Sequence, residues 1–157
     1  MPCKDKKYKR FRYSLIAVAW MLVIFLTSCT RVTRGAFVGT IVRSHVAHSE
    51  RWFDAFWERY WFIFVKGYHV MEFAVLMVLC HRALREYIDH RKAVCLSLLF
   101  SIAYAASDEW HQTFTPYRGG RATDVIIDTA GILFAASVIA FIAKRTKSRI
   151  ENITVCR

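Results

Sequence analysis

Acidic, basic and imidazole side chains are concentrated in one stretch of the sequence, Ser107 to Gly131, which joins two long apolar runs. Its ionisable residues are Asp108, Glu109, His111, Arg118, Arg121, Asp124 and Asp128. Placing one ionisable side chain in the apolar part of a membrane costs roughly 2.5–3.5 kcal/mol on insertion scales. A cluster of them therefore indicates a polar cavity, a substrate site or buried ion pairs.

Helical spacing places the polar residues of this stretch on shared faces. Asp108, His111 and Gln112 stand at i, i+3 and i+4, and Asp124 and Asp128 stand at i and i+4. Residues three or four apart are neighbours on one side of a helix. Each half of the stretch therefore presents one polar face.

A second polar face lies earlier in the sequence. Lys66, His69 and Glu72 follow one another at intervals of three residues inside another apolar run. At a rise of 1.5 Å per residue, Asp128 lies about 10 Å below Arg121, and Glu72 lies about 16 Å below the start of its run. The faces reach a similar depth, which predicts one shared polar cavity, since polar groups in lipid must find each other.

The composition indicates a membrane protein. The chain has 157 residues, is 55% hydrophobic and still has a net charge of +11. A membrane protein combines these properties easily, because its charges lie in the loops. Four apolar runs are close to the roughly 20 residues that a membrane-spanning helix needs, and they cover residues 13–29, 61–80, 93–110 and 122–143. We therefore expect an all-α integral membrane bundle of four transmembrane helices.

The basic residues of the loops predict the orientation of this bundle. If the four runs span, 15 Lys and Arg residues lie on the side of the two termini and 7 lie on the other side. The positive-inside rule then places both termini in the cytoplasm. We expect basic cytoplasmic tails over 1–12 and 144–157, a four-helix transmembrane domain over 13–143 and an outward-facing polar cavity.

The long outer loop, 30–60, contains an amphipathic segment that starts after Ser49. Its aromatic residues recur at helical spacing and are Trp52, Phe53, Phe56, Trp57 and Tyr60. Such a composition is typical of the membrane–water interface. The segment predicts an outer interfacial helix, with a lid over the cavity as the alternative.

The five cysteines form no CxxC pair and predict no disulfide framework. Leu26-Thr27-Ser28-Cys29, after a basic segment and an apolar run, is also typical of a lipoprotein signal. Cleavage before Cys29 would remove the first span. We expect this span to be retained, because three more spans follow it.

Two motifs resemble the VanZ-like family of membrane proteins. One is Asp108-Glu109-x-His111-Gln112 followed by Asp124-x3-Asp128-Thr129-x-Gly131, and the other is Lys66-x-x-His69-x-x-Glu72-Phe73. The resemblance covers roughly residues 14–143. It implies a bacterial four-span protein of the cell envelope, similar to a factor that lowers susceptibility to the glycopeptide antibiotic teicoplanin.

Three functions compatible with these residues remain open. In a binding protein, the outward site holds the headgroup of an envelope lipid or a peptidoglycan precursor, and Arg118 and Arg121 hold its phosphate or carboxylate. In a hydrolase or transferase, His111 with Asp108 or Asp124 is the general base. In a structural or partner-binding protein, the network only locks the bundle.

The candidate residues divide by role. The acid–base candidates are Asp108, Glu109, His111, Asp124 and Asp128, and the headgroup-binding candidates are Lys66, His69, Glu72, Gln112, Arg118 and Arg121. We expect no cofactor; a divalent cation between Glu72, Asp124 and Asp128 is the alternative. The basic tails suit a bilayer with anionic lipids better than they suit nucleic acid.

Overall fold

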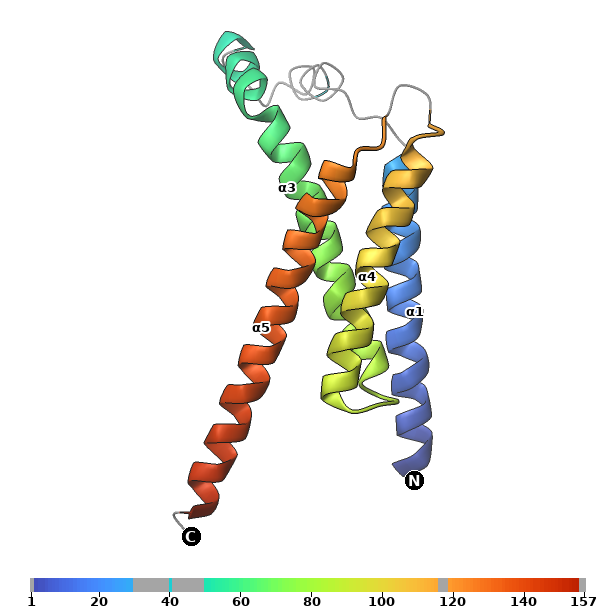
Figure 1. Ribbon diagram of the computed structural model, residues 1–157, viewed down its shortest axis with the longest axis vertical. Helices are drawn as coiled ribbons and strands as arrows, with labels where there is room; N and C mark the ends of the chain where they lie inside the picture. Colours follow the sequence, from blue (N-terminus) through green and yellow to red (C-terminus); the bar gives the residue numbers. More distant parts are fainter. Residues whose placement is uncertain (1, 30–39, 41–49, 116–118, 156–157) are drawn as a thin grey trace.

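The computed structural model describes residues 2–29, 40, 50–115 and 119–155. Over these residues the chain forms four long helices and no strand, namely α1 (Pro2–Cys29), α3 (Glu50–Leu84), α4 (His90–Gln112) and α5 (Ala122–Val155). Both termini lie at the same end of the bundle (Figure 1). The all-helical fold predicted from the sequence is confirmed.

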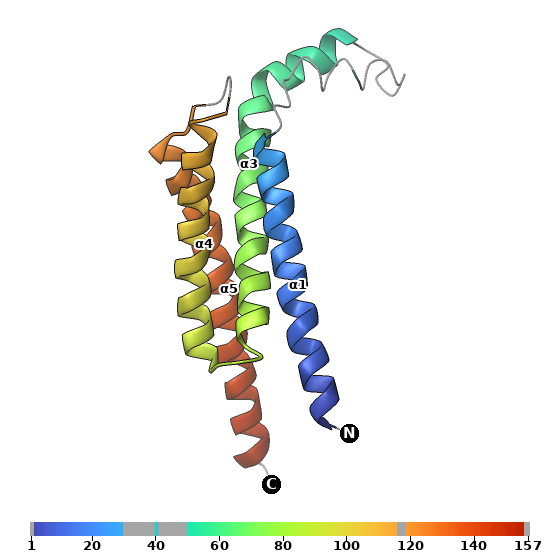
Figure 2. The same ribbon diagram turned by 90° about the vertical axis from the view of Figure 1, so that its right-hand side faces the viewer.

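Three of these helices are long and apolar enough to cross a membrane. The apolar parts are Lys7–Cys29 in α1, Ala55–Leu84 in α3 and Ala122–Arg149 in α5. The third predicted span lies within α4, which has basic residues before its apolar part and acidic residues after it. α4 nevertheless packs against α1, α3 and α5, and Figure 2 shows it running alongside α3 and α5. The described helices are those of a membrane protein with three long apolar candidate spans, and the predicted count of four spans stays a prediction.

The buried face of α4 explains how the helices come close together. Small residues recur at every fourth position along this face and are fully buried: Ala93, Ser97, Ser101 and Ala105. Small side chains allow helix backbones to approach within a membrane, where packing drives association. The same face ends in Asp108, Glu109 and Gln112, so the packing of α4 also buries its polar end.

Gly131 lies at a close contact between α3 and α5. A Cβ atom at this position would lie 2.5 Å from the carbonyl oxygen of Val70 and 2.8 Å from its Cγ1 atom. The two backbones therefore touch at this level. Lys66 is one helical turn before Val70 and Asp128 is about one turn before Gly131, so the crossing sets the two polar faces side by side. Below it lies an apolar core of Ile24, Phe73, Leu76, Met77 and Ile132.

The aromatic segment predicted as a separate interfacial helix is part of α3. α3 is continuous from Glu50 to Leu84, because neither Pro nor Gly interrupts its first turns. Figure 2 shows these turns bending away from the rest of the helix. The rings of Phe56 and Tyr60 pack 4.8 Å apart, and those of Trp57 and Phe64 pack 5.0 Å apart. Apart from residue 40, the remainder of the predicted outer loop before Glu50 lies outside the described residues.

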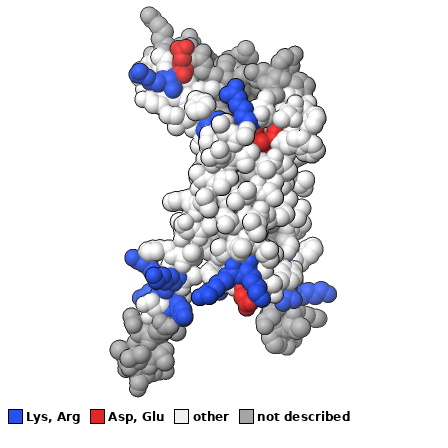
Figure 3. Space-filling view, viewed as in Figure 1, with Lys and Arg blue, Asp and Glu red and all other residues white. Residues whose placement is uncertain are grey.

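The charges lie at the two ends of the bundle. On the face in view, Figure 3 shows an uncharged band across the middle, with most of the visible Lys and Arg side chains at the end that carries the termini. At this end the Arg10 side chain donates a hydrogen bond to the backbone carbonyl of Glu86 at 2.9 Å, which ties α1 to the α3–α4 connection. The segments predicted as basic tails continue α1 and α5 as helix.

Candidate functional site

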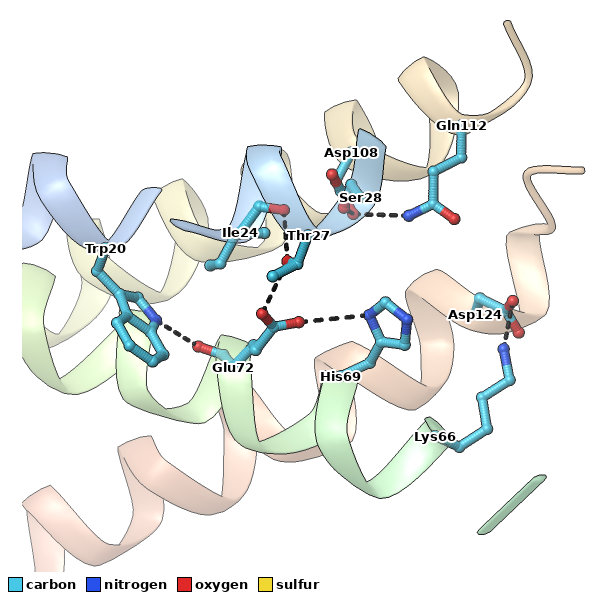
Figure 4. Close-up of polar contacts among 10 residues, drawn as sticks. All are labelled: Trp20, Ile24, Thr27, Ser28, Lys66, His69, Glu72, Asp108, Gln112 and Asp124. Atoms are coloured by element: carbon cyan, nitrogen blue, oxygen red, sulfur yellow. Dashed lines mark hydrogen bonds and ion pairs between the residues drawn. The ribbon is translucent and has the colours of Figure 1, made fainter. Parts of the chain in front are cut away.

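Polar side chains from all four helices meet near the end of the bundle opposite the termini (Figure 4). We call the following set the polar cluster: Lys66 and Glu72 of α3, Asp108 and Glu109 of α4, and Asp124 and Asp128 of α5. Glu72, Asp108, Glu109 and Asp128 are each at most 6% exposed. The cluster therefore lies inside the bundle.

Asp108 is held between α1 and its own helix. Its Oδ2 atom accepts hydrogen bonds from the hydroxyl of Ser28 at 2.9 Å and from the side-chain amide of Gln112 at 2.8 Å. Both partners are buried. Both donors are neutral, so they satisfy the oxygen without compensating its charge.

Glu72 occupies a similar position between α3 and α1. Its Oε1 atom accepts a hydrogen bond from the hydroxyl of Thr27 at 3.0 Å, and its Oε2 atom lies 3.7 Å from Nδ1 of His69. The indole of Trp20 donates to the backbone carbonyl of Glu72 at 3.0 Å. α1 therefore supports both buried carboxyl groups through the adjacent residues Thr27 and Ser28.

Lys66 and Asp124 form an ion pair that joins α3 to α5 (Figure 4). Asp128, one turn deeper in α5, is 2% exposed. It makes no hydrogen bond and no ion pair with any residue in the described part of the chain, although Lys66, Asp108, Glu109 and Asp124 are its charged neighbours. Asp128 is therefore a buried carboxyl group without a direct partner there.

Glu109 fixes the segment that leads into α5. Its Oε2 atom accepts a hydrogen bond from the backbone N–H of Arg121 at 2.9 Å. Gly120 permits this approach, since a Cβ atom there would collide with the backbone oxygen of Glu109 and lie 2.7 Å from Cγ2 of Thr113. An acidic group beside the first N–H groups of a helix also interacts favourably with the positive end of the helix dipole. Glu109 thus has a structural task in addition to any role in a site.

His111 and the arginines lie differently from the carboxyl groups. The His111 ring packs against Phe25 with 4.9 Å between centroids, and its buried Nδ1 atom has no hydrogen-bond partner among the described residues. The Arg121 residue is exposed and contributes its backbone, rather than its guanidinium group, to the contact with Glu109. Arg118 lies outside the described residues.

The carboxyl groups do not assemble into a metal site. Within the described ranges, no three His, Cys, Asp or Glu side chains are placed to bind one metal ion. A divalent cation held by Glu72, Asp124 and Asp128 therefore has no support in this geometry. Asp124 has Lys66 as its partner, while the Glu72 carboxyl group faces Thr27 and His69.

An apolar groove of about 510 Å³ adjoins the polar cluster. It runs along α3 beside α1, and its lining comprises Trp20, Ile63, Phe64, Gly67, Tyr68, Met71, Glu72 and Val75. A Cβ atom at Gly67 would meet nothing within 4 Å, so this part of the groove is open space. Glu72 belongs to both the groove and the cluster, and it joins an apolar surface to a set of buried carboxyl groups.

Comparison of the sequence with known protein families shows to which family the chain belongs. The family model described as VanZ/LLP1 matches residues 13–143, which include all four predicted spans and every member of the cluster. The chain belongs to the VanZ/LLP1 family. No curated protein and no solved structure matches it.

The sequence of this VanZ/LLP1 protein predicted the three polar faces but not the contribution of α1. Thr27 and Ser28 donate hydrogen bonds to the carboxyl groups of Glu72 and Asp108. Trp20 donates one to the backbone carbonyl of Glu72. None of these three α1 residues was a candidate. Two adjacent hydroxyl residues at the end of an otherwise apolar run were the available signal. A buried hydroxyl in a membrane helix needs a hydrogen-bond partner, which favours a polar neighbour on another helix.

Proposed function

We propose that this chain is a multi-pass protein of the bacterial cell membrane whose polar cluster faces outward and binds a headgroup. The ligand is an envelope lipid or a peptidoglycan precursor. Both termini lie in the cytoplasm, as the excess of Lys and Arg at their end of the bundle favours. Binding at this site lowers susceptibility to glycopeptide antibiotics.

One observation carries this proposal: Glu72 is shared by the apolar groove and the polar cluster. An amphiphile needs apolar surface for its chain and polar groups for its headgroup, side by side at one depth. The groove supplies the first and the buried carboxyl groups supply the second. Ionisable groups within membrane helices commonly line substrate sites, because a purely structural role seldom offsets their cost.

The contacts favour binding over acid–base catalysis. The alternative of a hydrolase or transferase requires His111 to pair with Asp108 or Asp124. Instead, Asp108 accepts hydrogen bonds from Ser28 and Gln112, Asp124 pairs with Lys66, and the His111 ring lies against Phe25. The groups that would form a catalytic dyad are engaged elsewhere.

The test fills the groove without touching the cluster. Gly67→Trp places an indole where a Cβ atom meets nothing within 4 Å, so the bundle has room for it. The matched control is Ala140→Trp, which adds the same group to an exposed position on α5 outside the groove. Native mass spectrometry of the full chain, purified in mild detergent from bacterial membranes, reports the lipids that stay bound.

We expect wild type and Ala140→Trp to retain lipid and Gly67→Trp to lose it. Glycopeptide tolerance of cells expressing each form should change in the same order. If Gly67→Trp retains as much lipid as wild type, the groove is not a binding surface and the proposal is wrong. If Gly67→Trp loses lipid while tolerance is unchanged, the link to glycopeptides fails and lipid binding stands.

A further inference from the structure

The polar cluster has an excess of acidic groups. Apart from Glu72, it contains four carboxyl groups, from Asp108, Glu109, Asp124 and Asp128, and Lys66 is its one lysine. Lys66 pairs with Asp124. Arg121 is exposed and contacts Glu109 only through its backbone N–H group. Within the described chain, the buried part of the site therefore offers acceptors and negative charge in excess of cations.

The hydrogen bonds within the cluster do not compensate this charge. Asp108 receives its hydrogen bonds from a hydroxyl and an amide, and Glu109 receives one from a backbone N–H group. Asp128 is 2% exposed and has neither a hydrogen bond nor an ion pair with any described residue. A buried ionised group without a charged partner is strongly unfavourable. Among the residues that the structure describes, no cation forms an ion pair with Asp108, Glu109 or Asp128.

A phosphate group would not bind favourably among these buried carboxyl groups. Bringing an anion beside Asp108, Glu109 and Asp128 adds like-charge repulsion in a medium of low dielectric constant. A primary ammonium group supplies three N–H donors and one positive charge. Hydrogen bonds between ionised donors and acceptors are the strong ones. An ammonium group therefore complements the buried carboxyl groups better than a phosphate does.

We propose that the polar cluster recognises the primary ammonium group of a zwitterionic lipid headgroup. This inference rests on the proposed function, and it reverses the expectation that a phosphate occupies the buried part of the site. The ammonium group lies among the carboxylates, with Asp128 as its principal acceptor. The phosphate of the same headgroup lies toward exposed Arg121, and an acyl chain lies in the groove beside Glu72.

The charge of Lys66 distinguishes an ammonium site from a phosphate site, because its removal should change lipid binding in opposite directions in the two cases. Lys66 already neutralises Asp124 from within the protein, so it competes with an ammonium ligand for the cluster. Removing its charge should strengthen the binding of an ammonium headgroup and weaken the binding of an anionic one. A phosphate-binding site would respond to Lys66→Met in the opposite direction, because Lys66 would then be one of its cations.

The experiment presents the purified full chain with equal amounts of three lipids that carry identical acyl chains. They are phosphatidylethanolamine, phosphatidylcholine, which has no ammonium N–H donor, and phosphatidylglycerol, which has no cation. Native mass spectrometry measures how much of each remains bound. We expect wild type to retain phosphatidylethanolamine over the other two by at least about tenfold, the factor that one charge-assisted hydrogen bond supplies.

Three variants complete this experiment. Asp128→Asn keeps the shape of the side chain but removes its charge, and the side chain makes no hydrogen bond with any described residue. This variant should abolish the preference for phosphatidylethanolamine. Lys66→Met should raise the retention of phosphatidylethanolamine. Arg59→Met, the matched control, removes an exposed cation from the same helix outside the cluster and should change neither value. Thermal melting of each variant verifies that the comparison is made between folded proteins.

Each result has a definite meaning. Equal retention of the three lipids, or a preference for phosphatidylglycerol that Lys66→Met weakens, would overturn the ammonium proposal while lipid binding stands. Absence of lipid from wild type and from Gly67→Trp alike would overturn the proposed function itself. Competition by water-soluble glycerophosphoethanolamine would show that the ammonium group is recognised without its chains. If wild type prefers phosphatidylethanolamine and the soluble competitor has no effect, the lipid is the ligand.

Discussion

The close contact at Gly131 predicts opposite effects for one and the same substitution at two glycines. Gly131 and Gly67 both lie inside helices, in α5 and α3 respectively. A Cβ atom at Gly131 would lie 2.5 Å from the carbonyl oxygen of Val70, whereas one at Gly67 would meet nothing within 4 Å. Gly131→Ala should therefore destabilise the protein, and Gly67→Ala should stabilise it.

The magnitudes follow from two separate contributions. Replacing Gly by Ala in the interior of a helix stabilises by about 0.5–1 kcal/mol, because Ala loses less conformational entropy on folding. This contribution is the same at both positions and cancels in the comparison. Adding one carbon atom to a fully packed contact costs about 1–3 kcal/mol. The contact at Gly131 is with a backbone oxygen, which cannot rotate away, so α3 and α5 must separate to relieve it.

The free energy of unfolding of each variant can be measured in mixed micelles with increasing SDS, followed by circular dichroism. We expect Gly131→Ala to lie about 1–3 kcal/mol below Gly67→Ala. Separation of α3 from α5 should also weaken the Lys66–Asp124 ion pair, which lies toward the polar end from this contact. Equal stabilisation by both substitutions would mean that the two backbones do not touch at Gly131, and the account of how the cluster is assembled would fail.

Two further predictions concern the membrane arrangement. In a background without the native cysteines, a cysteine at Gly119 should react with an impermeant maleimide added outside intact cells, and one at Asp89 should not; the reverse pattern would invert the predicted orientation. Cys29→Ala should leave the mass and membrane integration of the protein unchanged, because α1 is needed whole to bring Ser28 to Asp108. A larger mass, together with loss of lipid labelling, would instead show that the chain is processed as a lipoprotein.

Helical periodicity was sufficient to predict which polar residues share a face. Asp108 with Gln112, and Lys66 with the deeper Glu72, lie on the sides of α4 and α3 that turn into the bundle. The prediction of shared faces succeeded because polar side chains in a membrane helix face the interior of the bundle, where they contact other polar groups.

The choice of partners could not be predicted from periodicity. We expected Arg118 and Arg121, close to the acidic motif, to hold the phosphate or carboxylate of a headgroup. The exposed Arg121 is seen to offer its backbone N–H group to Glu109, and Arg118 lies outside the described residues. Conversely, Ser28 and Thr27 lie far from the motif in the sequence and reach it only because α1 packs against α3 and α4. Contacts between helices depend on crossing positions, which here depend on Gly131 and the small residues of α4.

The motif Asp124-x3-Asp128-Thr129-x-Gly131 therefore combines residues with different roles. Gly131 allows α5 to touch α3, and Asp124 uses that contact to pair with Lys66, so both contribute to the scaffold. Asp128 lies between them on the same face and is buried by the same packing, yet no described residue forms a direct contact with its charge. A scaffold that served only itself would favour an apolar residue here, because replacing a buried charge by an apolar group of similar volume is often neutral or stabilising. The carboxyl group at Asp128 is thus the part of the motif that the fold does not explain and that the proposed ammonium ligand would explain.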